Sequence, residues 1–381
     1  MKALRPIAVL GLLLLLVAGL AVFALLRKPV ASAPRQSPTP TPTASPTPTA
    51  NPTPTASPTP TPPPTPARPP VARSTLTWRP PACGDARHAC ATYNVANTGR
   101  HQDLHLDDSK DWIVKLPRVP VVGGLDINGG HTVIIIGGEI DLPTPCTSDN
   151  SPCHGFNISM GPASTGEVYI EGVLIKNPDP THSHYTGDGI DLNAEALSNL
   201  TLQNLRIEGV DGCDSGAAPG AHADVFQPYG ANGAVIHIDH LTGSTDYQGM
   251  QVAYDYGTPA RSADYRNVNI DVLPNPHAGC AGNNDRYAWW LTGGGGVYPD
   301  CWSLPTALIN DYALEPDGSL ASNAVWADPA NNHDCSATYR NGMVTWPAVT
   351  AISGGIHNGL PPGGDFVPAG VAGINYVSPG Y

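Results

Sequence analysis

Three short segments of the chain place carboxylate, amide and imidazole side chains among regularly spaced apolar ones. Their sequences are GDGIDL, HADVFQPY and DYQGMQV, at residues 187–192, 222–229 and 246–252. Aligned with one another, the segments share a column of apolar residues, Ile190, Phe226 and Met250. The next column is polar and contains Asp191, Gln227 and Gln251. Since successive side chains of a β-strand point to opposite faces, the polar column is expected to face outward as a ladder.

These residue types suit acid–base chemistry on a sugar chain. A glycosidase uses two carboxyl groups, about 5–5.5 Å apart when it retains configuration and about 6.5–9.5 Å apart when it inverts. Asp188 and Asp224, on coils stacked about 4.8 Å apart, are expected near the shorter distance, and His222 accompanies Asp224 as a third catalytic candidate. Tyr229 and Tyr247 flank the polar ladder, where their aromatic rings could contact sugar rings.

Each of these residues also has a purely structural interpretation. Asp next to Gly is ordinary turn chemistry, so Asp188 and Asp224 could simply cap turns. Gln227 and Gln251 could form a solvated or mutually hydrogen-bonded ladder. The sequence leaves both interpretations open.

Two further groups of residues also have both a functional and a structural interpretation. His182 and His184, in the segment THSHYTGDG, could share one face as metal ligands or belong to an ordinary loop. Trp289 and Trp290 could form a platform for a sugar or pack inside a cap at the C-terminal end of the domain. An ordinary loop and a packed cap are the simpler explanations.

The elements that must position these residues follow a repeated apolar pattern. The template h-x-h-x-x-h-x-h, in which h is an inward place, occurs five times, beginning at Val133, Val168, Leu200, Ile236 and Ala263. The two-residue skip in the middle predicts a strand, a bend and a second strand. Repetition every few tens of residues indicates stacked units that bury their apolar sides against their neighbours. The predicted fold is therefore an all-β parallel β-helix, right-handed because crossovers between parallel strands prefer that hand.

The N-terminal part of the chain lacks this pattern. An unbroken apolar run from Ile7 to Leu26 would span about 30 Å, the thickness of a bilayer's hydrocarbon core. Residues 1–30 are therefore predicted to be a signal anchor in the cell membrane with the remaining chain extracellular; the alternative is a cleaved signal peptide and a secreted protein. Residues 31–74, rich in Pro and Thr, are predicted to be a disordered stalk. Residues 75–381 are predicted to form the β-helix domain, with a C-terminal cap from about residue 275.

The eight cysteines all follow the apolar run, which indicates disulfides formed in an oxidising compartment. The candidate pairs along the sequence are Cys83 with Cys90, Cys146 with Cys153, and Cys280 with Cys301. The sequence has no C-x-x-C, so a structural zinc site built from cysteine is not expected.

The charge distribution argues against one class of partner. Seven of the 19 Lys and Arg and no Asp or Glu precede residue 75, which leaves the remaining chain with 12 basic and 32 acidic side chains and a formal charge of −20. Such a domain is not expected to bind nucleic acid, nor to capture a polyanion by simple electrostatic attraction. Calcium could reverse the charge locally, because carboxylates suit a hard cation.

The chain resembles the pectate-lyase-like superfamily of right-handed parallel β-helices over roughly residues 120–275. The resemblance rests on GDGIDL and on HADVFQPYGANGAVIHIDHLTGSTDYQGMQV, in which an Asp-containing strand, an I-D-H strand and a second polar strand follow one another. It implies calcium binding at three acidic positions, Asp224, Asp239 and Asp246. It also implies Arg266 as the base that removes a proton next to a uronate carboxyl. The chain has His237 where a Trp usually precedes I-D-H.

Two classes of function fit these features. The first is a membrane-tethered extracellular enzyme, a lyase or glycosidase, that acts on a polysaccharide or cell-surface glycan. The second is a non-catalytic glycan-binding or structural surface protein. The most informative single observation is whether four carboxylates converge in one groove or scatter around the solenoid, namely Asp188, Asp224, Asp239 and Asp246.

Overall fold

The computed structural model describes residues 76–146, 153–213, 222–252, 259–274, 277, 287–291, 304–315, 325–326 and 337–381. The predicted signal anchor and stalk lie outside these residues. The described part is all β, and it holds no helix of the length and apolarity that crossing a membrane requires.

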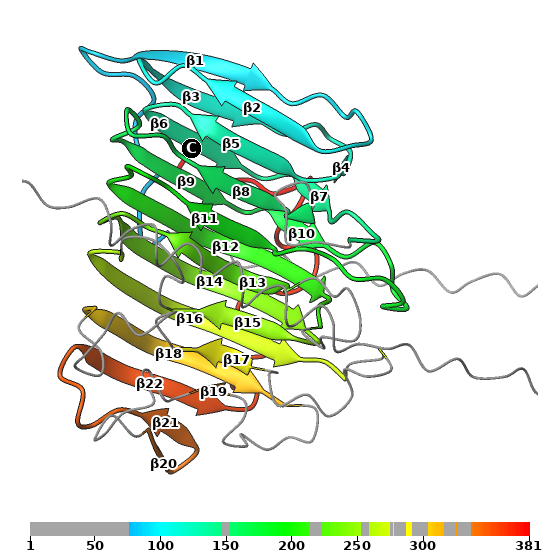
Figure 1. The fold of residues 1–381 in the computed structure, drawn as a ribbon, viewed down its shortest axis with the longest axis vertical. Coiled ribbons are helices and arrows are strands. Elements are labelled where there is room, and N and C mark those ends of the chain that lie inside the picture. The colour runs from blue at the N-terminus through cyan, green and yellow to red at the C-terminus, as the bar shows by residue number, and fades with distance from the viewer. Residues whose placement is uncertain are drawn as a thin grey trace, which may run out of the picture. The chain divides into compact units, whose positions relative to one another are not determined.

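The described strands form two sheets, and the chain passes alternately from one to the other (Figure 1). The larger sheet has 14 strands: β1 (Ala89–Asn94), β3 (Lys110–Lys115), β4 (Val121–Val122), β6 (Thr132–Ile136), β7 (Glu139–Asp141), β9 (Glu167–Glu171), β10 (Leu174–Lys176), β12 (Asn199–Val210), β14 (Val235–Thr245), β16 (Ser262–Val272), β18 (Thr306–Leu314), β20 (Thr338–Arg340), β21 (Met343–Thr345) and β22 (Ile352–Asn358). The smaller sheet has eight: β2 (Gln102–Leu106), β5 (Leu125–Gly129), β8 (Phe156–Ser159), β11 (Ile190–Asn193), β13 (Asp224–Gly230), β15 (Gln248–Gln251), β17 (Tyr287–Trp290) and β19 (Val325–Trp326). Only the pairs β20–β21 and β21–β22 are antiparallel among them. Parallel sheets linked in this order are compatible with the predicted solenoid.

The five template copies are consecutive neighbours in the larger sheet, as predicted. They begin in β6, β9, β12, β14 and β16, with Leu200 opposite both Val168 and Ile236. No inward side chain of the template is more than 2% exposed. In the last three copies the bend does not interrupt the strand, so β12, β14 and β16 each run through it.

The bend in each copy comes from its fifth residue, which has a positive φ. The angles are 65° at Gly137, 69° at Gly172, 56° at Asn204, 50° at His240 and 51° at Asn267. Gly adopts this region freely and Asn more readily than most residues, which explains four of the five choices. In four of the copies the two-residue skip therefore contains one residue with a positive φ, whereas in the first copy the following residue, Gly138, also has a positive φ of 109°.

A sixth copy, which the apolar pattern does not reveal, lies in β18. Asn310 supplies the bend with φ 60°, and its Nδ2 donates to Asn267 Oδ1 at 2.7 Å. The inward place after this bend holds Asp311, which is 0% exposed. Its Oδ1 accepts the Val268 backbone N–H at 3.0 Å, whereas its Oδ2 has no hydrogen-bond partner. A carboxyl group thus occupies a core position.

Replacing Asp311 by Asn is expected to stabilise the protein at neutral and alkaline pH. Burial raises the pKa of Asp311 well above its usual value, although hydrogen bonds from the Val268 and Ile309 backbones oppose this. A raised carboxyl pKa means that stability falls as pH rises above the unfolded value of about 4. Asn keeps an oxygen acceptor and carries no charge. The gain in free energy of unfolding should therefore grow with pH, up to about 1.4 kcal/mol for each pKa unit by which folding raises the pKa of Asp311. Urea unfolding at pH 4 and pH 8 measures it; an equal effect at both pH values would contradict it.

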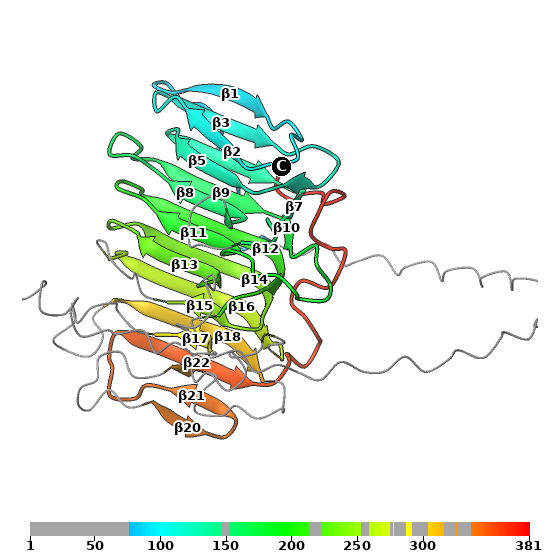
Figure 2. The same ribbon diagram turned by 45° about the vertical axis from the view of Figure 1, so that its right-hand side comes forward.

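Both ends of the described chain lie against the outer face of the larger sheet. The carbonyl of Trp78 accepts from Gln203 Nε2 at 2.6 Å. The C-terminal segment runs back along the stack (Figure 2), where Asp365 Oδ2 lies 2.8 Å from Arg206 Nη1 and the Tyr376 hydroxyl donates to Glu171 Oε1 at 2.5 Å. These segments cover the outer face of the larger sheet at β9 and β12.

Two of the predicted disulfides are present. Cys83 bonds to Cys90 and Cys146 bonds to Cys153, each closing a small loop. Cys213 is also disulfide-bonded, to a partner outside the described residues, and the predicted pair of Cys280 with Cys301 lies outside them as well.

At least three disulfides are therefore expected in the whole chain. Thiol counting on denatured, unreduced protein should find no more than two free thiols among the eight cysteines. Each bridge typically contributes about 2–4 kcal/mol, so reduction should also lower the melting temperature. A count of three or more free thiols would contradict this.

Candidate active site on the eight-stranded sheet

The predicted polar ladder runs along the smaller sheet. Asp191 pairs with Gln227 in register, and the pairing of Phe226 with Met250 places Gln251 next in line. The same column begins earlier than predicted, because Asp191 also pairs with Asn157, which pairs with Asp126. It ends at Trp290, opposite Gln251. Because Asp126 pairs in turn with Asp103, one polar residue per coil continues over six coils, listed in order as Asp103, Asp126, Asn157, Asp191, Gln227 and Gln251.

Gln227 and Gln251 form neither a solvated ladder nor a mutually hydrogen-bonded one, because both are buried and neither amide atom of Gln251 has a hydrogen-bond partner. Asp191 is 5% exposed, Gln227 1% and Gln251 0%. The ladder also leaves polar atoms unmatched: Asn157 Oδ1, Asp191 Oδ1 and both amide atoms of Gln251 are buried without a hydrogen-bond partner. An unsatisfied buried polar atom costs about 1–3 kcal/mol. Such a row of unmatched donors and acceptors is what a bound ligand with many hydroxyls would satisfy.

Asp188 and Asp224 lie together beside this ladder. Asp188 precedes β11 and Asp224 begins β13, and neither side chain is exposed. The Asp224 backbone N–H donates to Asp188 Oδ1 at 2.7 Å. When the Gln227 amide is oriented by its hydrogen bonds, its Nε2 donates to Asp224 Oδ2 at 2.8 Å and to Asp188 Oδ2 at 3.3 Å. One amide thus bridges two carboxyl groups from neighbouring coils.

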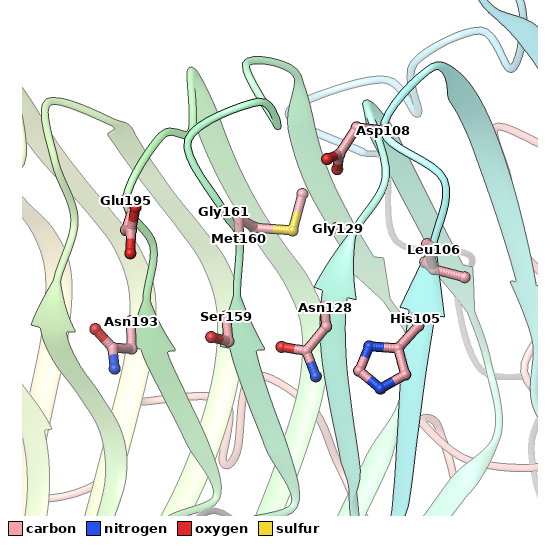
Figure 3. A pocket seen from close by; sticks show the side chains of 10 residues that line it. All are labelled: His105, Leu106, Asp108, Asn128, Gly129, Ser159, Met160, Gly161, Asn193 and Glu195. Carbon is pink, nitrogen blue, oxygen red and sulfur yellow. The ribbon is translucent and has the colours of Figure 1, made fainter.

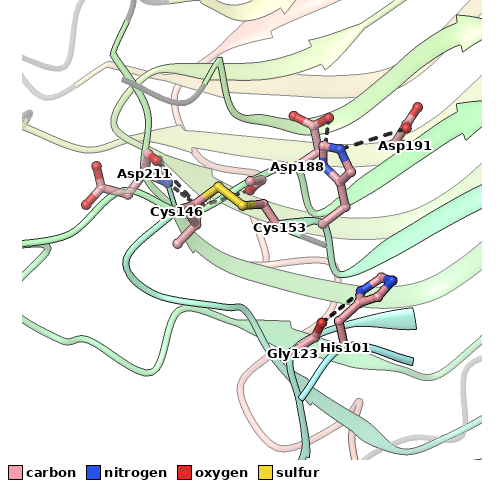
Figure 4. Close-up of a disulfide and its surroundings, with 10 residues drawn as sticks. His101, Gly123, Cys146, Cys153, Asp188, Asp191 and Asp211 are labelled. Carbon is pink, nitrogen blue, oxygen red and sulfur yellow. Dashed lines mark hydrogen bonds and ion pairs between the residues drawn. A yellow bond between two sulfur atoms is a disulfide. The ribbon is translucent and has the colours of Figure 1, made fainter. Parts of the chain in front are cut away.

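His154 lies between Asp188 and Asp191 and is the main residue that sequence reasoning missed. Its Nδ1 accepts the Asp188 backbone N–H at 3.0 Å and lies 3.1 Å from Asp188 Oδ2. Its Nε2 faces Asp191 Oδ2 at 4.0 Å, as the dashed lines at Asp188 and Asp191 show (Figure 4). Burial lowers the pKa of His154 to about 4, with the charge of Asp126 opposing the shift. The ring is therefore neutral at neutral pH.

Asp191 has the electrostatic character of a proton donor. Burial raises the pKa of its carboxyl well above the usual value, and the negative charges of Asp126 and Asp224 raise it further. A carboxyl group that keeps its proton near neutral pH can act as a general acid. Its Oδ1, free of protein partners, is the atom that could give the proton to a substrate.

Aromatic and imidazole rings border the carboxylates on one side. His222 is 25% exposed at its side chain, with Nδ1 3.4 Å from Asp224 Oδ2. Its ring meets that of Tyr247 edge-on, with centroids 5.3 Å apart, and lies 5.9 Å from the ring of Trp290. Tyr229 is half-buried, and its hydroxyl lies 3.2 Å from Gln227 Nε2. The predicted flanking residues and one Trp of the Trp289–Trp290 pair thus gather at the carboxylate cluster.

A cavity of about 500 Å³ continues along the same sheet. Its lining includes a second polar column, two residues further along each strand, in which His105 pairs with Asn128 and Asn128 with Ser159. Asn193, the next residue of that column, follows the paired Leu192. Figure 3 shows these four side chains side by side, one from each of four neighbouring strands. Strands in a sheet are about 4.8 Å apart, close to the length of one sugar unit.

Two residues assigned to the site by resemblance lie elsewhere. Asp239 is on β14 in the larger sheet, where it accepts hydrogen bonds from the Thr77 hydroxyl and from Asn267 Nδ2. It is 1% exposed, so it does not lie on an open surface either. Arg266, on β16, forms an ion pair with Asp264 at 2.6 Å and lies over the ring of Trp78.

The calcium site implied by the resemblance is therefore not assembled. Asp224 lies on the smaller sheet and Asp239 on the outer face of the larger one. Asp246 follows β14 and accepts the Gly212 backbone N–H at 3.1 Å, in a different cluster. They are separated because the chain passes from one sheet to the other: the three residues lie on two different sheets and on the turn between them.

The residues missed by sequence reasoning carried a usable signal. The segment CHGFNIS at residues 153–159 aligns with GDGIDLN at residues 187–193. This alignment places His154 with Asp188, Phe156 with Ile190 and Asn157 with Asp191. The apolar template does not reveal this strand, because it has only four residues.

Comparison of the chain with models of protein families, with curated proteins and with solved structures finds no match. Its function is therefore inferred from the residues of the site and their geometry. The cluster of carboxyl groups and the polar cavity are the two features that any function must explain.

Proposed function

We propose that the protein is an extracellular polysaccharide-active enzyme that cleaves glycosidic bonds at the carboxylate cluster of the smaller sheet. The observation that carries the proposal is the meeting of Asp188, Asp191 and Asp224 around His154 and Gln227. Buried carboxyl groups cost stability, so three of them close together around His154 and Gln227 are poorly explained by folding alone. Turn capping accounts for the hydrogen bond from the Asp224 backbone, and it does not account for Asp191.

The proposed roles follow from the protonation states. Asp191 donates its proton to the glycosidic oxygen as the bond to the leaving sugar breaks. A carboxylate of the Asp188–Asp224 pair either attacks the anomeric carbon or removes a proton from the water that does so. Water then supplies the hydroxyl and proton that complete the two products and restore the acid. Neutral His154 keeps Asp188 and Asp191 in place.

Hydrolysis is favoured over elimination. A lyase acting on a uronate needs a cation or an Arg to stabilise the carboxylate-bearing intermediate. Arg266 is engaged with Asp264 on the other sheet, and the implied calcium ligands are separated. The formal charge of −20 on residues 75–381 also favours a neutral glycan over a polyanion.

We further infer that residues 75–381 form a right-handed parallel β-helix of the pectate-lyase-like type, held outside the cell by a signal anchor at residues 1–30 and a stalk at residues 31–74. The supporting facts are the alternation of the chain between two parallel sheets, the disulfides and the apolar run of the N-terminus. Fractionation of expressed protein tests the anchor, since recovery of a soluble form beginning near residue 34 would contradict it.

A panel of neutral and acidic polysaccharides, assayed with and without calcium, tests the proposed activity. New reducing ends without unsaturated products are expected, because hydrolysis adds water across the bond and elimination leaves a double bond. Unsaturated product that requires calcium would replace hydrolysis by a lyase reaction. Absence of any product with every polysaccharide would contradict the enzyme.

A second candidate function is glycan binding without catalysis. A row of uncharged polar side chains in the cavity, one from each coil, favours it, because His105, Asn128, Ser159 and Asn193 offer hydrogen bonds to a glycan; Asp108 and Glu195 also line the cavity. In that case the panel should give bound protein without product. Replacing Tyr229 by Ala should then weaken binding more than replacing Asp224 by Asn.

A further inference from the structure

A second cluster of His and Asp lies where strands of the larger sheet end and the chain turns toward the smaller one. Asp211 follows β12 and Asp246 follows β14, and the pairing of Val210 with Thr245 puts the two carboxyl groups at equal places on neighbouring coils. His182 comes from the connection between β10 and β11. Both Asp side chains are 0% exposed.

The three side chains point their ligand atoms at one another. One nitrogen of His182 and one oxygen from each of Asp211 and Asp246 all lie within 4.8 Å of one another. His182 Nδ1 and Asp211 Oδ2 are 3.6 Å apart, too far for a good hydrogen bond, and both atoms are buried without a hydrogen-bond partner. Two carboxylates buried on stacked coils repel each other, and a cation bound between them would lower that cost.

We propose that His182, Asp211 and Asp246 bind one divalent transition-metal ion, for which Zn²⁺ is the best match. Zinc accepts imidazole nitrogen and carboxylate oxygen at about 2.0–2.2 Å. Two such ligands at a tetrahedral angle would be about 3.4 Å apart, close to the distance between His182 and Asp211. Calcium and magnesium prefer oxygen ligands alone, so the imidazole favours zinc over either.

The surroundings support an ion at this place. His277 Nε2 lies 2.6 Å from Asp211 Oδ1, an outer hydrogen bond of the kind that orients a metal ligand. A Cβ at Gly209 would lie only 2.9 Å from His182 Cε1, so glycine gives the imidazole its room.

Neither His184 nor the other cluster of His and Asp in the described residues has the same buried, unpaired ligand atoms. His184, the other member of the sequence pair, is 54% exposed at its side chain and pairs with Asp179. In the cluster of His88, Asp111 and His131, the carboxyl group of Asp111 already accepts from His131 and from the Gly84 and Thr132 backbones. Its oxygens are satisfied by the protein, so that cluster needs no ion.

Bound metal would join three successive turns of the chain next to the proposed active site. The Thr186 backbone N–H donates to the Asp211 carbonyl at 2.9 Å, two residues before Asp188, and Tyr247 directly follows Asp246. The ion would therefore be structural, fixing the approach to the carboxylate cluster without contacting the substrate.

Calorimetric titration of the full, untagged chain with ZnCl₂, after metal removal, tests this site. One Zn²⁺ per chain should bind and raise the melting temperature. His182→Gln should weaken binding at least tenfold, while His184→Gln, its matched control, should leave the affinity unchanged. Asp246→Asn provides a second variant should His182→Gln fail to fold.

Three outcomes would overturn the proposal. They are the absence of saturable binding, equal weakening by the His182 and His184 variants, and CaCl₂ binding at this site as tightly as ZnCl₂. Because the readout is binding and thermal stability, the result is independent of whether any polysaccharide is cleaved.

Discussion

Replacing Asp191 by Asn should lower kcat on a cleaved polysaccharide by about 10²–10⁴-fold, the usual contribution of a general acid. An amide has the shape of a carboxyl group and cannot donate its proton to the leaving oxygen. The raised pKa of Asp191, caused first by burial and then by Asp126 and Asp224, means that the folded protein already favours the uncharged form. The variant should therefore be at least as stable as the parent at neutral pH, with the advantage fading below the usual carboxyl pKa of about 4.

The pH dependence of kcat gives a sharper test than the rate alone. In the parent protein, kcat should fall on the alkaline side as Asp191 loses its proton, at a pH well above the usual carboxyl range. That limb should disappear in the Asn variant, because no proton remains to be lost. A variant with an unchanged alkaline limb would show that another residue is the acid.

A matched control comes from the other sheet. Asp239 is also a buried Asp, held by the Thr77 hydroxyl, Asn267 and His240, and it lies away from the carboxylate cluster. Asp239→Asn should lower the melting temperature and leave kcat of the folded protein unchanged. Equal losses of kcat in both variants would indicate a general effect of damaging the fold, and would count against Asp191 as the acid.

Asp224→Asn extends the same experiment to the second carboxyl group. Gln227 Nε2 donates to Asp224, so the variant loses a charged acceptor and should also lose turnover. Activity restored to this variant by azide or formate, small anions that can replace a missing carboxylate, would support a role for Asp224 in attack on the anomeric carbon. Parental activity in the variant would remove Asp224 from the mechanism.

The sequence predicted the sheet and its core because both depend on a local, repeated pattern. Each template copy contains its own bend residue and its own inward side chains, so its place relative to its neighbours follows from alignment alone. The pairing of Asp191 with Gln227 was predictable for the same reason. A side chain's direction on a strand is fixed by counting residues, and counting does not depend on the rest of the fold.

Contacts between distant segments were not predictable in this way. Asp239 points outward as alternation requires, yet it is buried because Thr77, 162 residues earlier, lies over it. Asp246 is close to Asp224 in sequence, yet the turn between the sheets places it with His182 and Asp211. Alternation tells which face of a strand a residue occupies, and it does not tell what covers that face.

The sixth copy and His154 show a different limit. An Asp at the inward place of β18 removes the apolar signal on which the template depends, although Asn310 still marks the bend. The short strand β8 offers too few inward places for a pattern to stand out. A search for apolar periodicity misses positions where function or strain places a polar residue at an inward place.

Replacing Leu202 by Ala should lower the free energy of unfolding by about 2–5 kcal/mol, the range for a fully buried Leu. Leu202 is 0% exposed and pairs in register with Ile170 on one side and Ile238 on the other. Removing its side chain leaves a cavity that the two neighbouring coils share, because strand spacing is fixed by backbone hydrogen bonds and cannot close the gap. Leu360, which is 47% exposed, provides the matched control, for which the same substitution should cost less than about 0.5 kcal/mol.

Hydrogen exchange should show where the stability is lost. Each coil of a stacked fold is stabilised mainly by its immediate neighbours. The backbone amides of β9, β12 and β14 should therefore lose protection in Leu202→Ala before those of β3 or β22 do. A uniform loss along the whole stack would mean that the domain unfolds as one cooperative unit, and a loss of stability below about 1 kcal/mol would show that Leu202 does not pack in a continuous core.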